Sequence, residues 1–284
     1  MTAQSADSAA KSPGVSPQEI EALNRHGVFF KKRVLSELRG IDGLDFFSEE
    51  FGVTFGSPTA IDLIAFERRQ DRLLLFVFEC KRAYTKQKTW LFFRDIDTRF
   101  RVCRLASIMG ASGCYSKDVP PLEGLSVCSE GYEMVTVNGT CKADQNPIFE
   151  AANQLSRGFL GFSLLRKQQR DRSVGFNQPV DCVVPVLATT AQLRVANLNT
   201  LSVSLSTGNL TGDLQCHNAD WLVLKHPFAL ESGGDLKDFR SDPTNAADLD
   251  HWGQIYRESL FVVRAEKLRH FLSNSFRDYL AGLK

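Results

Sequence analysis

Residues 60–82 read AIDLIAFERRQDRLLLFVFECKR. Residues 61–66 are apolar apart from Asp62, residues 73–78 are apolar throughout, and the charged stretch 67–72 separates the two runs. Two short apolar runs around a polar turn predict a β-hairpin. Because the second run is apolar on both of its faces, we expect that strand to lie inside a sheet. This hairpin is therefore the predicted centre of the fold.

Charged side chains stand at the end of the second predicted strand. Side chains alternate along a strand, so Glu79 and Lys81 share one face while Cys80 points to the other. A buried charge without a partner is strongly unfavourable and shifts the pKa of the group. We therefore expect Glu79 and Lys81 to be compensated by each other, by Asp62, by a metal ion or by a phosphate.

Asp62 and the tripeptide 79–81, Glu-Cys-Lys, resemble the active-site motif of the PD-(D/E)xK nuclease superfamily. Ile61 stands where the motif of that family has proline. Residues 48–53 (SEEFGV) and 185–193 (PVLATTAQL) are similar to further core segments of the superfamily. The resemblance implies an α/β fold of the restriction-endonuclease-like kind, with a mixed central sheet flanked by helices.

The resemblance also implies a Mg²⁺-dependent nuclease, with Mn²⁺ as a substitute metal. Mg²⁺ prefers oxygen ligands and is commonly held by one or two carboxylates. Asp62 and Glu79 are the expected carboxylate ligands, and the Cys80 backbone carbonyl is a further ligand that the resemblance implies. Lys81 is expected to hold or polarise the attacking water and to offset negative charge in the transition state.

Three further residues are candidates for the site. The superfamily often adds a fourth acid from the first helix or strand, for which Glu37 and Glu50 are candidates, with a surface position as the alternative for each. Gln87 lies where some branches place a polar active-site residue, and a solvated helix surface is its alternative. For the motif residues themselves, the alternative is a structural ion-pair cluster at a strand end.

A cluster of positive charge follows the motif. Eight basic residues lie within 81–104, opposed only by Asp95 and Asp97, although the net charge of the whole chain is +1. A local basic field beside the candidate site suits a polyanion such as DNA, which we prefer over RNA as the expected substrate. A solvated helix face is the alternative. The candidate nucleic-acid contacts are Arg82, Lys86, Gln87 and Lys88.

The order of the chain predicts one domain. Residues 1–17 are small and polar and are expected to form a disordered tail ahead of a nuclease-like domain over 18–284. Ser16 and Glu19 form a capping box for a first helix, which Gly27 weakens in its middle. The apolar spacing within 87–108 predicts a long helix.

Residues at about 109–146 are rich in Gly and Cys and are expected to form a surface insertion, with a small hairpin near 132–137. Asn146 and Pro147 predict the start of another helix. Residues 231–250 are expected to form a polar loop, and 265–280 a final helix. The remaining strands are predicted at 46–55, 180–187, 192–197, 202–205, 221–224 and 259–264.

The seven cysteines of the chain include no C-x-x-C pair, which favours a reducing, cytoplasmic setting over a disulfide framework. No apolar run is long enough to cross a membrane, and the N-terminus lacks the apolar region of a secretory signal. A zinc-binding module remains a third hypothesis, although structural zinc sites use closer pairs than the four candidate cysteines. These are Cys103, Cys114, Cys128 and Cys141.

The second hypothesis is a non-catalytic protein-interaction module that retains the nuclease-like fold. Such a module would bind a partner protein through the insertion at 109–146 and the acidic loop at 231–250. Many enzymes of the superfamily act as dimers, so the resemblance also makes a homodimer a candidate assembly.

Overall fold

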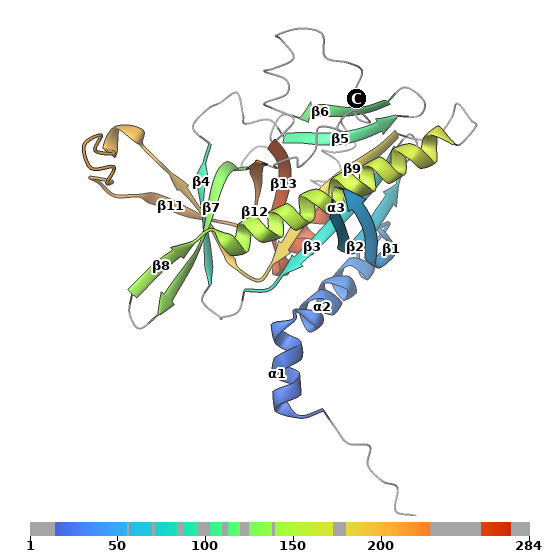
Figure 1. Cartoon of the computed structure of the whole chain (residues 1–284), viewed down its shortest axis with the longest axis horizontal. Helices are drawn as coiled ribbons and strands as arrows, with labels where there is room; N and C mark the ends of the chain where they lie inside the picture. The colour runs from blue at the N-terminus through green and yellow to red at the C-terminus, as the bar shows by residue number, and fades with distance from the viewer. Residues whose placement is uncertain are drawn as a thin grey trace, which may run out of the picture.

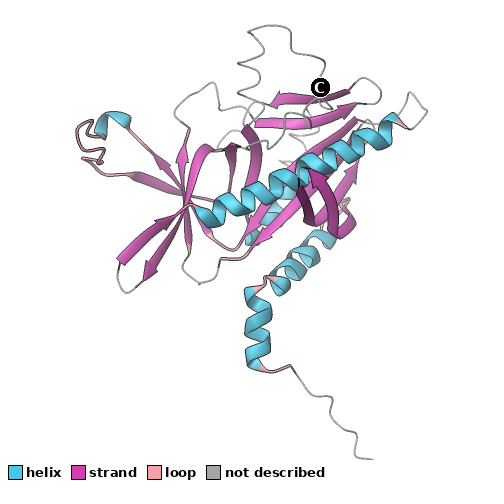
Figure 2. Ribbon diagram, viewed as in Figure 1, coloured by secondary structure: helices cyan, strands magenta, loops and turns pink. Residues whose placement is uncertain are grey.

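The computed structural model describes residues 15–55, 57–69, 72–83, 88–95, 103–109, 113–119, 125–137, 140–172, 180–227 and 257–273. These residues form a mixed α/β fold in which helices cover both faces of one large, twisted sheet (Figures 1 and 2). The predicted α/β class with a mixed central sheet is therefore confirmed. Two apolar cores fill the fold, one on each face of the sheet.

The predicted hairpin is confirmed as β2 (Ser57–Arg68) and β3 (Arg72–Lys81), which pair antiparallel. Strand β1 (Asp45–Phe55) pairs antiparallel with the other edge of β2. Residues 74–78 of β3 are buried, which agrees with a strand inside the sheet. Its side chains alternate between the two cores: Leu75 and Val77 face one, and Phe76 and Phe78 the other.

Three further strands complete the centre of the sheet: β9 (Val180–Thr189), β13 (Arg257–Arg264) and β12 (Trp221–Pro227). Strand β9 lies parallel to β3 on one side and to β13 on the other, and β13 pairs antiparallel with β12. All three strands were predicted from their apolar runs and are confirmed. The carboxyl ends of β3, β9 and β13 therefore meet at one edge of the sheet.

The sheet continues through β7 (Val127–Val137), β4 (Thr89–Arg94), β10 (Gln192–Asn197) and β11 (Gln215–Ala219). Two hairpins extend it at the sides. Strands β5 (Cys103–Met109) and β6 (Gly113–Val119) attach through β9, and β8 (Thr140–Asp144) pairs with β7.

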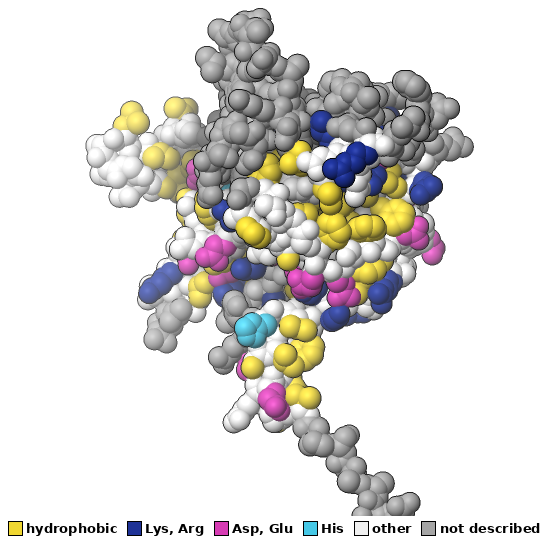
Figure 3. Space-filling model, turned by 45° about the vertical axis from the view of Figure 1, so that its right-hand side comes forward, with side chains coloured by type: hydrophobic (Ala, Val, Ile, Leu, Met, Phe, Trp, Pro, Cys, Tyr) yellow, Lys and Arg dark blue, Asp and Glu magenta, His cyan; other side chains and the backbone are white. Residues whose placement is uncertain are grey.

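Helix α3 (Asn146–Asp171) covers one face of the sheet, and α2 (Val28–Arg39) and α5 (Leu268–Leu272) lie on the other (Figure 1). Helix α1 (Pro17–Arg25) begins at the predicted capping box, in which the Ser16 hydroxyl accepts from the Glu19 N–H. The prediction of one continuous first helix is wrong. Gly27 takes a left-handed φ of 72° and separates α1 from α2. Figure 3 shows apolar side chains gathered on these projecting helices.

Two predictions for the middle of the chain are wrong. The expected helix over 87–108 is instead β4 and β5. In β4, Trp90 and Phe92 are buried at every second position, and the strand lies between β7 and β10. The segment at about 109–146 is not only a surface insertion, because β7 belongs to the central sheet and Val127 and Cys128 are buried. The predicted small hairpin is confirmed as β7 and β8.

The chain after β10 differs in detail from the prediction. The expected strand at 202–205 is wrong: a 3-10 helix, η2 (Thr200–Ser202), is followed by a single bridge between Val203 and Leu210. The final helix is described only as η4 (Ala265–Lys267) and α5. The loop at 231–250 and most of the 1–17 tail lie outside the described residues. Within the described part of the chain, no helix has the length and apolar character that a bilayer span requires.

Candidate functional site

Strands β2 and β3 separate directly beside the motif residues. Their pairing ends at Leu63 and Phe78, whereas β3 continues along β9 as far as Lys81. Beyond this point the Cys80 backbone N–H faces the gap and donates to Asp62 Oδ2 at 2.7 Å. The Asp62 carboxylate therefore takes the position that a backbone carbonyl of β2 holds elsewhere in the ladder.

The structure brings the three predicted motif residues together. Glu79 is only 6% exposed. Burial raises the pKa of its carboxyl well above the ordinary value, and the Asp62 carboxylate adds to the increase, while Lys81 opposes it. Burial also raises the pKa of Asp62, against the lowering effects of the Cys80 N–H and of Lys81. Two acids thus repel each other at the strand ends, and Lys81 acts on both.

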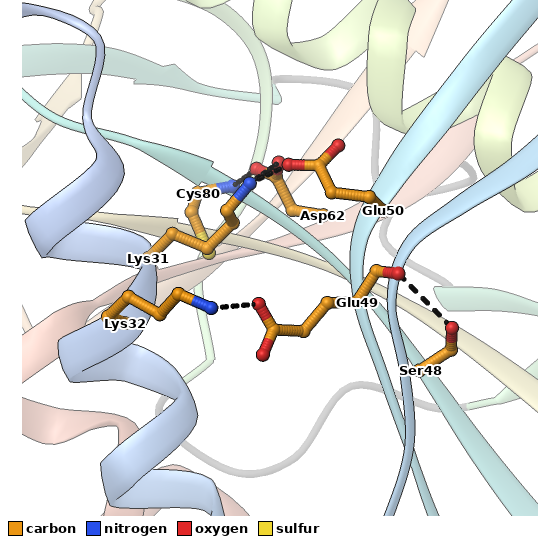
Figure 4. A network of polar contacts seen from close by, with 7 residues as sticks. All are labelled: Lys31, Lys32, Ser48, Glu49, Glu50, Asp62 and Cys80. Carbon is orange, nitrogen blue, oxygen red and sulfur yellow. Dashed lines mark hydrogen bonds and ion pairs between the residues drawn. The ribbon is translucent and has the colours of Figure 1, made fainter.

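A fourth residue of the cluster, Lys31, was not predicted. Its ammonium pairs with Glu50 and lies 3.6 Å from Asp62 Oδ1 (Figure 4). The sequence does indicate that Lys31 faces the protein interior. It precedes Leu35 by four residues and Leu38 by seven, and so shares their buried helix face. Lys31 also lowers the pKa values of both Asp62 and Glu79.

Glu50 joins the cluster from β1. The pairs Glu49–Leu63 and Phe51–Ile61 place Glu50 level with Asp62 on the neighbouring strand. Glu50 has a φ of 49°, an uncommon conformation for a residue other than glycine, at the point where its side chain turns toward Lys31. Glu50 and Asp62 therefore lie side by side on β1 and β2, and Glu79 comes one residue after the last pair of β2 and β3.

The other candidate fourth acid, Glu37, does not lie beside these acids. It is further along α2 and pairs with Arg33 and Arg269. Its carboxylate is therefore engaged with the outer face of α2 and with the chain near the C-terminus. Of the two candidates, the structure brings only Glu50 to the motif residues.

The candidate nucleic-acid contacts are mostly engaged elsewhere or not described. The Lys88 side chain is only 11% exposed, and its Nζ lies 2.6 Å from Glu133 Oε1 on β7, so its role as a nucleic-acid contact stays a prediction. The Arg82 guanidinium donates to the carbonyl of Asn24 in the last turn of α1. Lys86 and Gln87 lie outside the described residues. Arg82 is thus the one of these four that the structure places beside the motif.

Three oxygen donors at the cluster are of the kind that could take part in holding a magnesium ion. Asp62 and Glu79 supply two carboxylates, and the N–H and C=O of one strand residue point to the same side, so the Cys80 carbonyl faces the gap. Mg²⁺ commonly takes one or two carboxylates and keeps several waters. Among the described residues, no group of three or more His, Cys, Asp or Glu side chains could hold a metal ion together. Any metal at this place would therefore depend on the carboxylate pair.

The cysteines give no support to a zinc site within the described residues. Cys141 is exposed and pairs with Thr136 on β7, whereas Cys128 is buried. Since Thr136 and Cys128 are eight residues apart on one strand, Cys128 and Cys141 are separated by roughly 26 Å. The side chains of Cys103 and Cys114 lie outside the described part of the structure.

The arrangement is a pair of carboxylates, Glu79 buried and Asp62 partly buried, with two lysines beside it. The chain matches no protein-family model, no curated protein and no solved structure. The chemistry of these side chains is therefore the basis on which a function can be assigned.

Proposed function

We propose that the protein is a Mg²⁺-dependent nuclease of the PD-(D/E)xK type, with a restriction-endonuclease-like fold, and that it acts on DNA in preference to RNA. The observation that carries this proposal is the meeting of Asp62, Glu79 and Lys81 where β2 and β3 separate. Phosphodiester hydrolysis requires neutralisation of negative charge and an activated water. This cluster contains side chains suited to both tasks.

Each residue has a role that follows from its position. Asp62 and Glu79, with the Cys80 carbonyl, would hold Mg²⁺ or Mn²⁺. The bound ion would act as a Lewis acid on the scissile phosphate. Because burial raises the pKa of both carboxyls, and the Asp62 charge raises that of Glu79 further, a cation beside them would relieve an unfavourable charge. Lys81, beside both acids, would hold the attacking water and stabilise charge on the phosphate.

The proposal extends to the surroundings of the cluster. Arg82 follows the motif directly. Its guanidinium could contact the phosphate backbone of a bound strand. A cytoplasmic setting and a homodimer belong to the same proposal, and size measurement in solution tests the second of these.

The test is a cleavage assay on purified protein with Mg²⁺, Mn²⁺ or a chelator. Supercoiled DNA, linear DNA and RNA are compared as substrates. We expect cleavage of DNA with either metal, and a loss of at least about a hundred-fold in Asp62→Asn, Glu79→Gln and Lys81→Met. Glu49→Gln and Lys32→Met are matched controls, because they remove the same charges from a neighbouring exposed pair. Equal activity in all five variants would place the chemistry elsewhere.

A second candidate is the interaction module, and one observation favours it. The segment between β10 and β11 presents Leu201 and Leu205 almost fully to solvent, with Leu210 also exposed. Exposed apolar side chains gathered on one segment often mark a protein-binding surface. A folded wild type that binds neither Mg²⁺ nor Mn²⁺ would favour this candidate over the nuclease.

A further inference from the structure

The Lys31 ammonium lies where it meets two acids of the cluster at once. It pairs with Glu50 of β1 and lies 3.6 Å from Asp62 Oδ1 of β2. The other Asp62 oxygen, Oδ2, already accepts the Cys80 N–H. Both oxygens of Asp62 are therefore engaged by the protein itself, one by a backbone donor and one by a cation (Figure 4).

The backbone holds Lys31 in this place. The Lys31 N–H donates to the Gly27 carbonyl at 3.0 Å, in the first turn of α2. The carbonyl of Asn24, at the end of α1, accepts from Arg82, which directly follows Lys81 of the motif. The side chain of Lys31 is 16% exposed. The N-terminal helices are thus attached to the motif strand, and Lys31 is enclosed against the acids.

We propose that Lys31 is a built-in competitor of the divalent metal ion. Its ammonium must leave Asp62 Oδ1 before a metal can bind there, so the position of α2 sets the metal affinity of the site. This inference rests on the proposed metal site. The physical reason is that a single positive charge at 3.6 Å from a ligand oxygen repels an incoming divalent cation and competes for the same lone pairs.

The neighbouring Lys32 supplies a matched control. It follows Lys31 on the same helix, carries the same charge, and pairs with Glu49 at 2.5 Å. A substitution at Lys32 changes the net charge of the protein by the same amount, but it does not touch Asp62. A difference in metal affinity between the two variants therefore reports the position of the removed charge and not the net charge of the protein.

The experiment is a titration of the full chain with Mn²⁺. Calorimetry and the electron paramagnetic resonance signal of the free ion measure the binding. Because Lys31 lowers the pKa values of Asp62 and Glu79, its removal favours their protonation. The titrations are therefore repeated at several values between about pH 6 and pH 9, so that protonation of the two carboxyls shows as a dependence of the dissociation constant on pH. We expect the dissociation constant to fall by at least about ten-fold in Lys31→Met, and by less than about two-fold in Lys32→Met.

Lys31→Arg keeps the cation and is expected to bind Mn²⁺ no more tightly than the wild type. Lys31→Gln repeats the charge removal if Lys31→Met does not fold, and near-ultraviolet circular dichroism checks the fold of each variant. Unchanged or weaker binding in both charge-removing variants would overturn the role of Lys31.

Asp62→Asn and Glu79→Gln separate this failure from a failure of the proposed function. If these two variants lose Mn²⁺ binding while Lys31→Met binds as the wild type does, the metal site stands and the competition by Lys31 is refuted. If both bind Mn²⁺ as the wild type does, the metal site itself is refuted, and the inference about Lys31 fails with it.

Discussion

Glu79→Gln should make the metal-free protein more stable and should abolish the metal binding that we propose for the site. The pairing of β2 and β3 ends one residue before Asp62 and Glu79, and the charge of Asp62 contributes to the raised pKa of Glu79. Two like charges roughly 5–7 Å apart repel by about 2–3 kcal/mol at an effective dielectric constant of about 20. Lys81 and Lys31 offset part of this repulsion. We therefore expect a gain of about 1–2 kcal/mol, or roughly 2–6 °C in Tm for a chain of this size.

The dependence on pH has a definite sign. The pKa of Glu79 is raised in the folded state, so the folded protein binds more protons than the unfolded chain. The stability of the wild type therefore falls as pH rises from the unfolded pKa of about 4.3 through the raised folded value. Glu79→Gln removes this decline, so the two proteins should differ most at the highest pH.

Thermal unfolding followed by circular dichroism in a chelator, at several values between about pH 5 and pH 8, measures the difference. Glu49→Gln is the control, because the pKa of Glu49 is lowered by its hydrogen bond with Lys32 and its removal should not stabilise the protein. Added Mg²⁺ should raise the Tm of the wild type and leave that of Glu79→Gln unchanged. A Glu79→Gln protein that is less stable than the wild type at the highest pH would refute the electrostatic reasoning.

Two further predictions concern parts of the structure away from the cluster. Asp181 is fully buried between Arg166 and Arg170, at 2.8 and 3.0 Å, so Asp181→Asn should cost about 3–5 kcal/mol in urea denaturation. Asp220→Asn, which breaks partly exposed pairs, should cost less than about 1 kcal/mol, and equal losses would contradict the effect of burial. Burial lowers the pKa of His226 to about 4, so the neutral ring contributes stability that is lost as pH falls from about 6.5 toward that value. His226→Gln should flatten this acid decline in Tm, and an unchanged decline would show that another group titrates.

The sequence predicted those parts of the fold in which local pattern and tertiary environment agree. The hairpin and β9 are long apolar runs bounded by polar residues, and such runs are strands inside a sheet. The prediction of a helix over 87–108 failed because the spacing of its aromatic residues is compatible both with the 3.6-residue period of a helix and with the two-residue period of a strand. Pairing with β7 and β10 on both edges decides in favour of β4, with Trp90 and Phe92 on one face.

The candidate site was predicted in part for the same reason. Asp62, Glu79 and Lys81 belong to the same end of one hairpin, so the prediction of the hairpin also predicts that they lie near one another. Lys31 belongs to a helix whose docking depends on contacts far along the chain, and no spacing within α2 shows which acids its ammonium will meet. The contact of Lys88 with Glu133 on β7 could not be predicted, because the expected helix over 87–108 gave no pairing with β7.

The strands that carry the three acids follow one another along the chain without interruption, as β1, β2 and β3. The strands of such a meander are joined by short loops, so their pairing has a low entropic cost and is expected to form quickly during folding. Its assembly nevertheless brings three carboxyl groups to neighbouring strands. The Lys31 ammonium from α2 supplies a positive charge to two of them, so the docking of the N-terminal helices offsets charge that the meander alone would leave unbalanced.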